Sequence, residues 1–82
     1  MRLHLRLLSR ADCCLCETMK AVLDEAADAG WCSWEEVNVD RDQALRARYG
    51  ADVPVLLFGD RVLFKHRVTR DALLAALRRE KR

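Results

Sequence analysis

Residues 3–17, LHLRLLSRADCCLCE, set the architecture of the whole chain. Apolar and polar side chains alternate through residues 3–8, as expected for a β-strand with one buried face. A polar turn follows at residues 9–12, and an amphipathic helix then begins at about Cys13. Cys13 and Cys16 stand three residues apart at the amino end of that helix, so their sulfur atoms are close enough to form and break a disulfide. A C-x-x-C pair in this position is typical of a thiol redox site.

The helix offers its two cysteines different surroundings. The start of a helix favours negative charge, which stabilises a thiolate relative to a thiol, and Cys13 stands at or before the first turn. Arg10 adds a nearby positive charge, whereas Asp12 opposes it with a negative one. Cys16 lies one turn further along and is expected to be more buried. We therefore expect Cys13 to be the more reactive of the two.

The rest of the chain continues the alternation of strands and helices. In order, the sequence predicts a strand at 3–8, a helix at 13–28, a strand at 33–39, a helix at 40–49, strands at 55–58 and 61–66, and a helix after 69. Gly30, Asp40 and Thr69 are the expected cap residues of the three helices. Gly59-Asp60, between two apolar runs, is a two-residue hairpin signal. The order β-α-β-α-β-β-α predicts an α/β fold with one mixed four-stranded sheet flanked by helices.

Length and composition limit the classes of function. The 82 residues are expected to form one domain, 1–82, and the 51% hydrophobic content suffices for one core. The 15 basic and 13 acidic residues give a net charge of +2, too balanced to suggest a nucleic-acid partner. No stretch approaches the roughly 20 apolar residues of a membrane span, and the alternating first strand is not typical of a signal peptide. We therefore expect no membrane association and a location in the cytoplasm, where thiols stay reduced.

Three features together resemble the glutaredoxins: residues 9–17, SRADCCLCE, the Val53-Pro54 step before an apolar strand, and the hairpin followed by the last helix. The likeness extends over nearly the whole chain and is greatest to short bacterial glutaredoxin-like proteins. It implies the thioredoxin fold with sheet order 2-1-3-4, and with the third and fourth strands antiparallel to the rest. It also implies a thiol–disulfide oxidoreductase with Cys13 as the nucleophile and Cys16 as the resolving thiol.

The resemblance further implies a substrate groove. Pro54 stands where this family has a cis proline that faces the cysteines, and Val53 stands where the backbone hydrogen-bonds the substrate. Arg10 occupies the place of a frequent lysine. Cys14 and Leu15 replace the usual Pro-Tyr between the two cysteines. These five residues are the candidate substrate-binding residues.

The expected partners follow from the same resemblance. Glutaredoxins usually carry Gly-Gly after the fourth strand, where the glycine backbone holds a carboxylate of glutathione, but residues 64–71 contain no glycine. The electron donor therefore stays open between glutathione, a thioredoxin-type reductase and a dedicated partner. We expect the substrate to be a disulfide-containing protein or a glutathione mixed disulfide. We also expect a monomer with no bound cofactor.

Two other classes of function stay open. Four cysteines and two histidines could hold zinc or an iron–sulfur cluster, although no second C-x-x-C provides the usual zinc spacing. A cluster shared between two subunits through Cys13 is known in some glutaredoxins. The other class is a catalytically idle adaptor that uses the groove for binding alone. Cys14 is either an exposed, tolerated thiol or a second acceptor for oxidation, and Cys32 is expected to be a buried small apolar residue.

Overall fold

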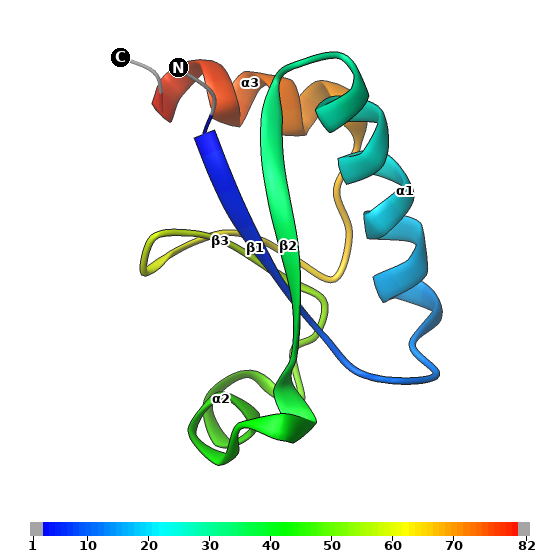
Figure 1. Cartoon of the computed structure of the whole chain (residues 1–82), viewed down its shortest axis with the longest axis vertical. Helices are drawn as coiled ribbons and strands as arrows, with labels where there is room; N and C mark the ends of the chain where they lie inside the picture. Colours follow the sequence, from blue (N-terminus) through cyan, green and yellow to red (C-terminus); the bar gives the residue numbers. More distant parts are fainter. Residues whose placement is uncertain (1–2, 81–82) are drawn as a thin grey trace.

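The structure, a computed structural model, describes residues 3–80 (Figure 1). The elements follow the predicted order: β1 Leu3–Ser9, α1 Cys14–Asp28, β2 Cys32–Asn38, a 3₁₀ helix η1 Val39–Arg41, α2 Gln43–Tyr49, β3 Val55–Phe58, β4 Arg61–Lys65 and α3 Arg70–Glu80. No helix within the described range is long and apolar enough to cross a bilayer.

The four strands form one sheet in the order β2-β1-β3-β4, as the resemblance implied. β1 and β2 are parallel, with Leu3 opposite Cys32 and Ser9 opposite Asn38. β3 is antiparallel to β1, and β4 is antiparallel to β3. The expected direction of the fourth strand is therefore wrong. Two reversals bring β4 back to the direction of β1 and β2, so β3 is the strand that opposes the rest.

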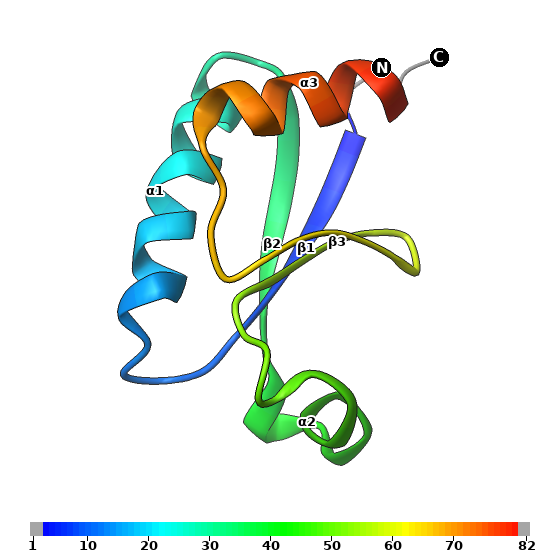
Figure 2. The ribbon, with the colours of Figure 1, turned by 180° about the vertical axis from the view of Figure 1, so that it is seen from behind.

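The larger core lies between one face of the sheet and helices α1 and α3. Figures 1 and 2 show α3 at one end of the strands and α2 at the other end, with α1 alongside. The apolar side chains of α1 recur at helical spacing, so they point together toward the sheet. The largest fully buried side chains of this core are Leu5, Leu7, Met19, Leu23, Leu56, Leu73 and Leu77.

A second, smaller core lies on the opposite face of the sheet. Leu8 follows Leu7 directly, and successive strand residues point to opposite faces, so its side chain lies on the α2 side. There it belongs to a buried cluster with Val39, Val55, Tyr49 and Leu57. The carboxyl end of β1 is therefore buried on both faces.

Helix α2 begins later than the sequence predicted. Asp42, rather than Asp40, is its N-cap, because the Asp42 carboxylate accepts hydrogen bonds from the backbone N–H of Ala44 at 2.9 Å and of Leu45 at 3.1 Å. Asp40 instead belongs to η1, where its backbone N–H donates to the side chain of Asn38. The prediction of Asp40 as the cap is therefore wrong by two residues.

The glycine signals are confirmed at both positions where a positive φ is required. Gly30, at φ 82°, follows α1, and the next N–H, of Trp31, donates back to the carbonyl of Ala26 at 2.9 Å. This is the Schellman arrangement that ends many helices. Gly59, at φ 61°, opens the two-residue loop of the β3–β4 hairpin.

The segment after β4 departs from its prediction. The strand ends at Lys65, one residue early, because His66 adopts φ 69°. The backbone N–H of Arg67 then donates to the carbonyl of Lys65 at 2.7 Å, which closes a tight turn. The N–H of His66 donates to the carbonyl of Pro54 at 2.8 Å, so this turn is tied to the start of β3.

Candidate functional site

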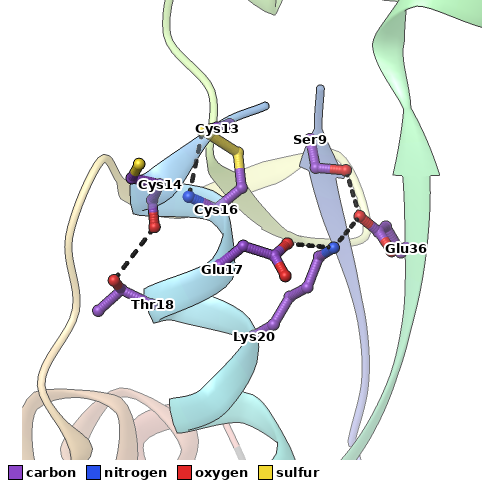
Figure 3. Close-up of polar contacts among 8 residues, drawn as sticks. All are labelled: Ser9, Cys13, Cys14, Cys16, Glu17, Thr18, Lys20 and Glu36. Atoms are coloured by element: carbon purple, nitrogen blue, oxygen red, sulfur yellow. Dashed lines mark hydrogen bonds and ion pairs between the residues drawn. A yellow bond between two sulfur atoms is a disulfide. The ribbon is translucent and has the colours of Figure 1, made fainter. Parts of the chain in front are cut away.

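The predicted cysteine pair lies at the junction of β1 and α1. After β1, the chain turns through Asp12, at φ 57°, and Cys13 becomes the N-cap of α1 with extended backbone. Cys13 and Cys16 form a disulfide with their Cα atoms 5.2 Å apart (Figure 3). The sulfur of Cys13 also accepts a hydrogen bond from the backbone N–H of Cys16 at 3.1 Å. A free N–H of the first helical turn thus points at this sulfur.

The two bonded cysteines differ in exposure. Cys16 is fully buried in the structure, whereas Cys13 is half-buried at the surface end of the helix. The expectation that Cys16 is the more buried of the two is therefore confirmed. A molecule that approaches from solvent meets the sulfur of Cys13 before that of Cys16.

Cys14 and Leu15, between the bonded cysteines, point in different directions. Cys14 is exposed and lines an open pocket of about 510 Å³ on the β2 side of the site. Leu15 is half-buried and lines a second pocket on the α3 side. The backbone carbonyl of Cys14 accepts a hydrogen bond from the hydroxyl of Thr18, one turn along the helix.

Arg10 lies at the rim of the first pocket but its charge has a partner. Its guanidinium makes two contacts of 3.2 Å with the carboxylate of Asp40. Both side chains are partly exposed, so this is a solvent-screened pair that ties the loop to η1. Arg10 therefore does not act as a free cation beside the cysteines.

The Val53-Pro54 peptide bond is cis, as the resemblance implied. Pro54 is fully buried, and Val53 is half-buried against the smaller core. Hydrogen bonding of a substrate by the Val53 backbone stays a prediction.

The first pocket contains a charged cluster that sequence reasoning missed (Figure 3). The ammonium of Lys20 lies 2.6 Å from a carboxylate oxygen of Glu17 and 2.8 Å from one of Glu36. The hydroxyl of Ser9 donates to the same Glu36 oxygen at 2.6 Å. Hydrogen bonds to Glu17 and Glu36 raise the pKa of Lys20 above its usual value, and hydrogen bonds from Lys20 and Ser9 lower the pKa of Glu36. In the sequence, the only sign of this charged cluster is the spacing of Glu17 and Lys20 by about one helical turn.

The second pocket, of about 380 Å³, was also missed. It lies between the first turns of α1, the end of β4 and the start of α3. Its apolar lining comes from Leu15, Met19, Phe64, Val68 and Ala72, and its polar lining from Thr18, His66, Arg67 and Thr69. These residues come from two segments that are far apart in the sequence, 15–19 in α1 and 64–72 from β4 to the start of α3, so no local pattern includes both.

Metal ligands do not gather anywhere in residues 3–80. No group of three or more His, Cys, Asp or Glu side chains there could hold a metal ion. Cys32 is fully buried in the larger core, as expected, and takes no part in the disulfide. Within the described part of one chain, the metal alternative therefore has no ligand set to support it.

Comparison with known proteins adds a family and a fold. Residues 4–78 match the model of the glutaredoxin-like domain (DUF836). A glutaredoxin-like protein of Dictyostelium discoideum, a YDR286C homolog, is 26% identical over an alignment of 77 residues, and the match covers 87% of this chain and 71% of that protein. The X-ray structure of protein XcR50 from X. campestris is 32% identical, with a TM-score of 0.77, and the match covers 92% of this chain and 96% of that one.

A more distant structure supports the fold alone. A mutant thioredoxin from Halobacterium salinarum is 24% identical, with a TM-score of 0.67 over 94% of this chain and 73% of that one. Together with the observed element order and sheet order, this similarity identifies the architecture as the thioredoxin fold.

Proposed function

Because this chain belongs to the glutaredoxin-like domain family, we propose that it is a thiol–disulfide oxidoreductase that uses Cys13 and Cys16. The observation that carries the proposal is the disulfide itself. It joins a half-buried sulfur at the amino end of α1 to a fully buried sulfur one turn along. Exchange chemistry needs one reachable sulfur and one protected partner, and this pair supplies both.

The proposed reaction has two exchange steps. In the reduced protein, the Cys13 thiolate attacks one sulfur of a substrate disulfide, and the other substrate sulfur leaves as a thiolate that takes up a proton. The Cys16 thiolate then attacks the Cys13 sulfur of the mixed disulfide and releases the second substrate sulfur. Two electrons pass to the substrate, and the Cys13–Cys16 disulfide forms.

The helix supports the charged form of the attacking sulfur. The backbone N–H of Cys16, which donates to the Cys13 sulfur at 3.1 Å, is a stronger donor to a thiolate than to a neutral thiol. The positive end of the helix dipole adds to this effect. Asp12 opposes it, and Arg10 gives little help because Asp40 pairs with it.

The remaining roles complete the proposal. Substrate contacts are assigned to the backbone of Val53, to Pro54, and to Cys14 and Leu15, with Arg10 at the margin. The substrate is a disulfide-containing protein or a glutathione mixed disulfide, and glutathione is one candidate reductant. The protein acts as a cytoplasmic monomer without a bound cofactor.

A mass measurement and a trapping experiment test the proposal. Reduction of the purified protein should add two hydrogens, reversibly, and Cys13→Ser should abolish that couple. Cys14→Ser is the matched control because it removes the neighbouring thiol, and it should retain the couple. Cys16→Ser should hold a substrate as a mixed disulfide at Cys13.

The outcomes separate the alternatives. A chain that shows no reversible couple would be an idle adaptor rather than an oxidoreductase. If a Cys13→Ser/Cys16→Ser double variant still trapped a substrate as a mixed disulfide, Cys14 rather than Cys13 would be the attacking thiol. Turnover of one mixed disulfide with glutathione, and then with a thioredoxin-type reductase, identifies the electron donor.

A further inference from the structure

The apolar pocket on the α3 side of the disulfide is open to solvent, and no side chain of residues 3–80 fills it. Its volume of about 380 Å³ lies within the range of roughly 300–1,000 Å³ that is usual for ligand sites. Leu15, Phe64 and Val68 are half-buried and line the pocket, so part of their apolar surface is accessible there. An apolar side chain placed there would remove that surface from water.

The pocket adjoins the redox pair through the covalent chain. Leu15 lies between Cys14 and Cys16, and it is part of the pocket lining. On the other side, the backbone N–H of His66 holds the carbonyl of Pro54 at 2.8 Å, and His66 also lines the pocket. Cys13 itself lines the other pocket, so a segment bonded to its sulfur reaches this one by passing over Leu15, two residues along the chain.

The charge at the pocket rim is positive and uncompensated. Arg67 lines the pocket, is exposed, and has no ion pair among residues 3–80. The neighbouring cations differ, because Lys65 pairs with Asp52 at 3.1 Å and Arg70 pairs with Glu25 at 3.5 Å. Arg67 is thus the cation next to the pocket that is available to a carboxylate of a partner.

The opposite side of the disulfide has the reverse charge. Asp12, Glu17 and Glu36 line the other pocket, and both carboxylates of the Lys20 cluster share a single ammonium. A partner that carried its carboxylate on that side would meet like charge. The two rims therefore favour one orientation of a charged partner over the other.

We propose that the α3-side pocket, at Leu15, Phe64 and Val68 with Arg67 on its rim, binds a segment of a protein substrate in which a large apolar residue and an acidic residue flank the reacting cysteine. This assignment rests on the proposed oxidoreductase function and names its substrate class. The apolar residue enters the pocket and the carboxylate pairs with Arg67. Glutathione fits less well, because it offers carboxylates but no apolar side chain to cover the pocket lining.

Chromogenic peptides test this inference. Each peptide contains one cysteine, which forms a mixed disulfide with an aromatic thiol. In one set of peptides Leu and Glu precede the cysteine, and in a second set they follow it. Control peptides replace Glu by Lys or Leu by Gly, and glutathione with the same aromatic group is a fourth probe. The reduced full chain carries Cys14→Ser in all arms, so that no second exposed thiol contributes.

The readout is the rate of aromatic thiolate release. Cys13 attacks the peptide sulfur, the probe disulfide breaks, and the aromatic thiolate leaves with the electron pair. Cys16 then releases the peptide thiol as the chain becomes oxidised. In the favoured direction, we expect the Leu-Glu peptide to react about tenfold faster than the peptide with Gly in place of Leu, and roughly two- to fivefold faster than the peptide with Lys in place of Glu. Arg67→Glu should reverse the order of the Glu and Lys peptides.

The symmetric aromatic disulfide, which has no peptide, measures the intrinsic reactivity of Cys13. Each peptide rate is divided by this rate in the same variant, so that any effect of Arg67→Glu on the intrinsic reactivity of Cys13 cancels. Equal rates for all peptides would overturn the pocket assignment but leave the oxidoreductase function standing. The pocket assignment would also be overturned if the glutathione probe reacted faster than every peptide. Loss of reaction with every probe would instead contradict the proposed function.

Discussion

Lys20→Met removes the cation that links α1 to the edge strand β2. The substitution keeps the length of the side chain but leaves Glu17 and Glu36 without their shared ammonium, at 2.6 and 2.8 Å. Glu17 is 70% exposed and Glu36 is 40% exposed, so solvent screens both pairs. Two such pairs contribute about 1 kcal/mol together, which corresponds to roughly 4–8 °C in Tm for a domain of this size.

The pH dependence of this loss has a definite sign. The lowered pKa of Glu36 means that its contribution is present above the ordinary carboxyl value of 4.5 and is lost as the pH falls through the folded value. The raised pKa of Lys20 means that its contribution is present below 10.5 and is lost as the pH rises through the folded value. The stability difference between the two proteins should therefore be largest near neutral pH and shrink in acid.

Urea unfolding of the oxidised proteins measures this difference, because the disulfide is then the same in both. Lys65→Met is the matched control, since it removes a single exposed pair with Asp52 and should cost less. High salt should reduce the Lys20 effect. A loss above about 3 kcal/mol would mean a buried ion pair. A difference that stays constant from pH 7 to pH 3 would refute the coupling to Glu36.

Three further predictions concern the fold. Asp42→Ala should cost about 1 kcal/mol in chemical unfolding because two backbone N–H groups lose their acceptor, whereas Asp40→Ala should cost less; the reverse order would restore Asp40 as the cap. His66→Gly should leave stability unchanged or raise it by up to about 1 kcal/mol, and His66→Val should lower it, because φ is 69° there. Leu23→Ala should cost about 2–5 kcal/mol in thermal unfolding, while Val62→Ala, at an exposed position, should stay within about 0.5 kcal/mol.

Local signals account for the parts of the fold that were predicted well. Gly30 and Gly59 both adopt the positive φ that their turns require, and a glycine in such a place indicates a turn without reference to the rest of the chain. The cysteine spacing likewise brings Cys13 and Cys16 together within one helical turn. The prediction of the α2 cap was wrong because two nearby aspartates offer the same local signal. Aspartate is a common cap residue at either position, but in the structure Asp40 belongs to η1, with its N–H bonded to Asn38, and the carboxylate of Asp42 accepts from the first N–H groups of α2.

In the candidate site, too, the features with a local sequence signal were predicted and the contacts between distant elements were not. The cysteine pair and the cis peptide before Pro54 were expected from short motifs and from the resemblance that they carry. The Lys20–Glu36 contact and the apolar pocket were not expected, because each joins elements that are distant along the chain. Arg10 shows how such a contact changes an interpretation, since Asp40 compensates the charge that was expected beside Cys13.

The order of strands and helices, and the disulfide at the amino end of α1, follow from residues a few positions apart, because periodicity, caps and turns are short-range properties of the backbone. The pairing of Arg10 with Asp40, the contact of Lys20 with Glu36 and the shape of the two pockets depend on which segments pack against each other. Such packing sums many weak contacts between distant residues, and no window of the sequence contains both members of those pairs.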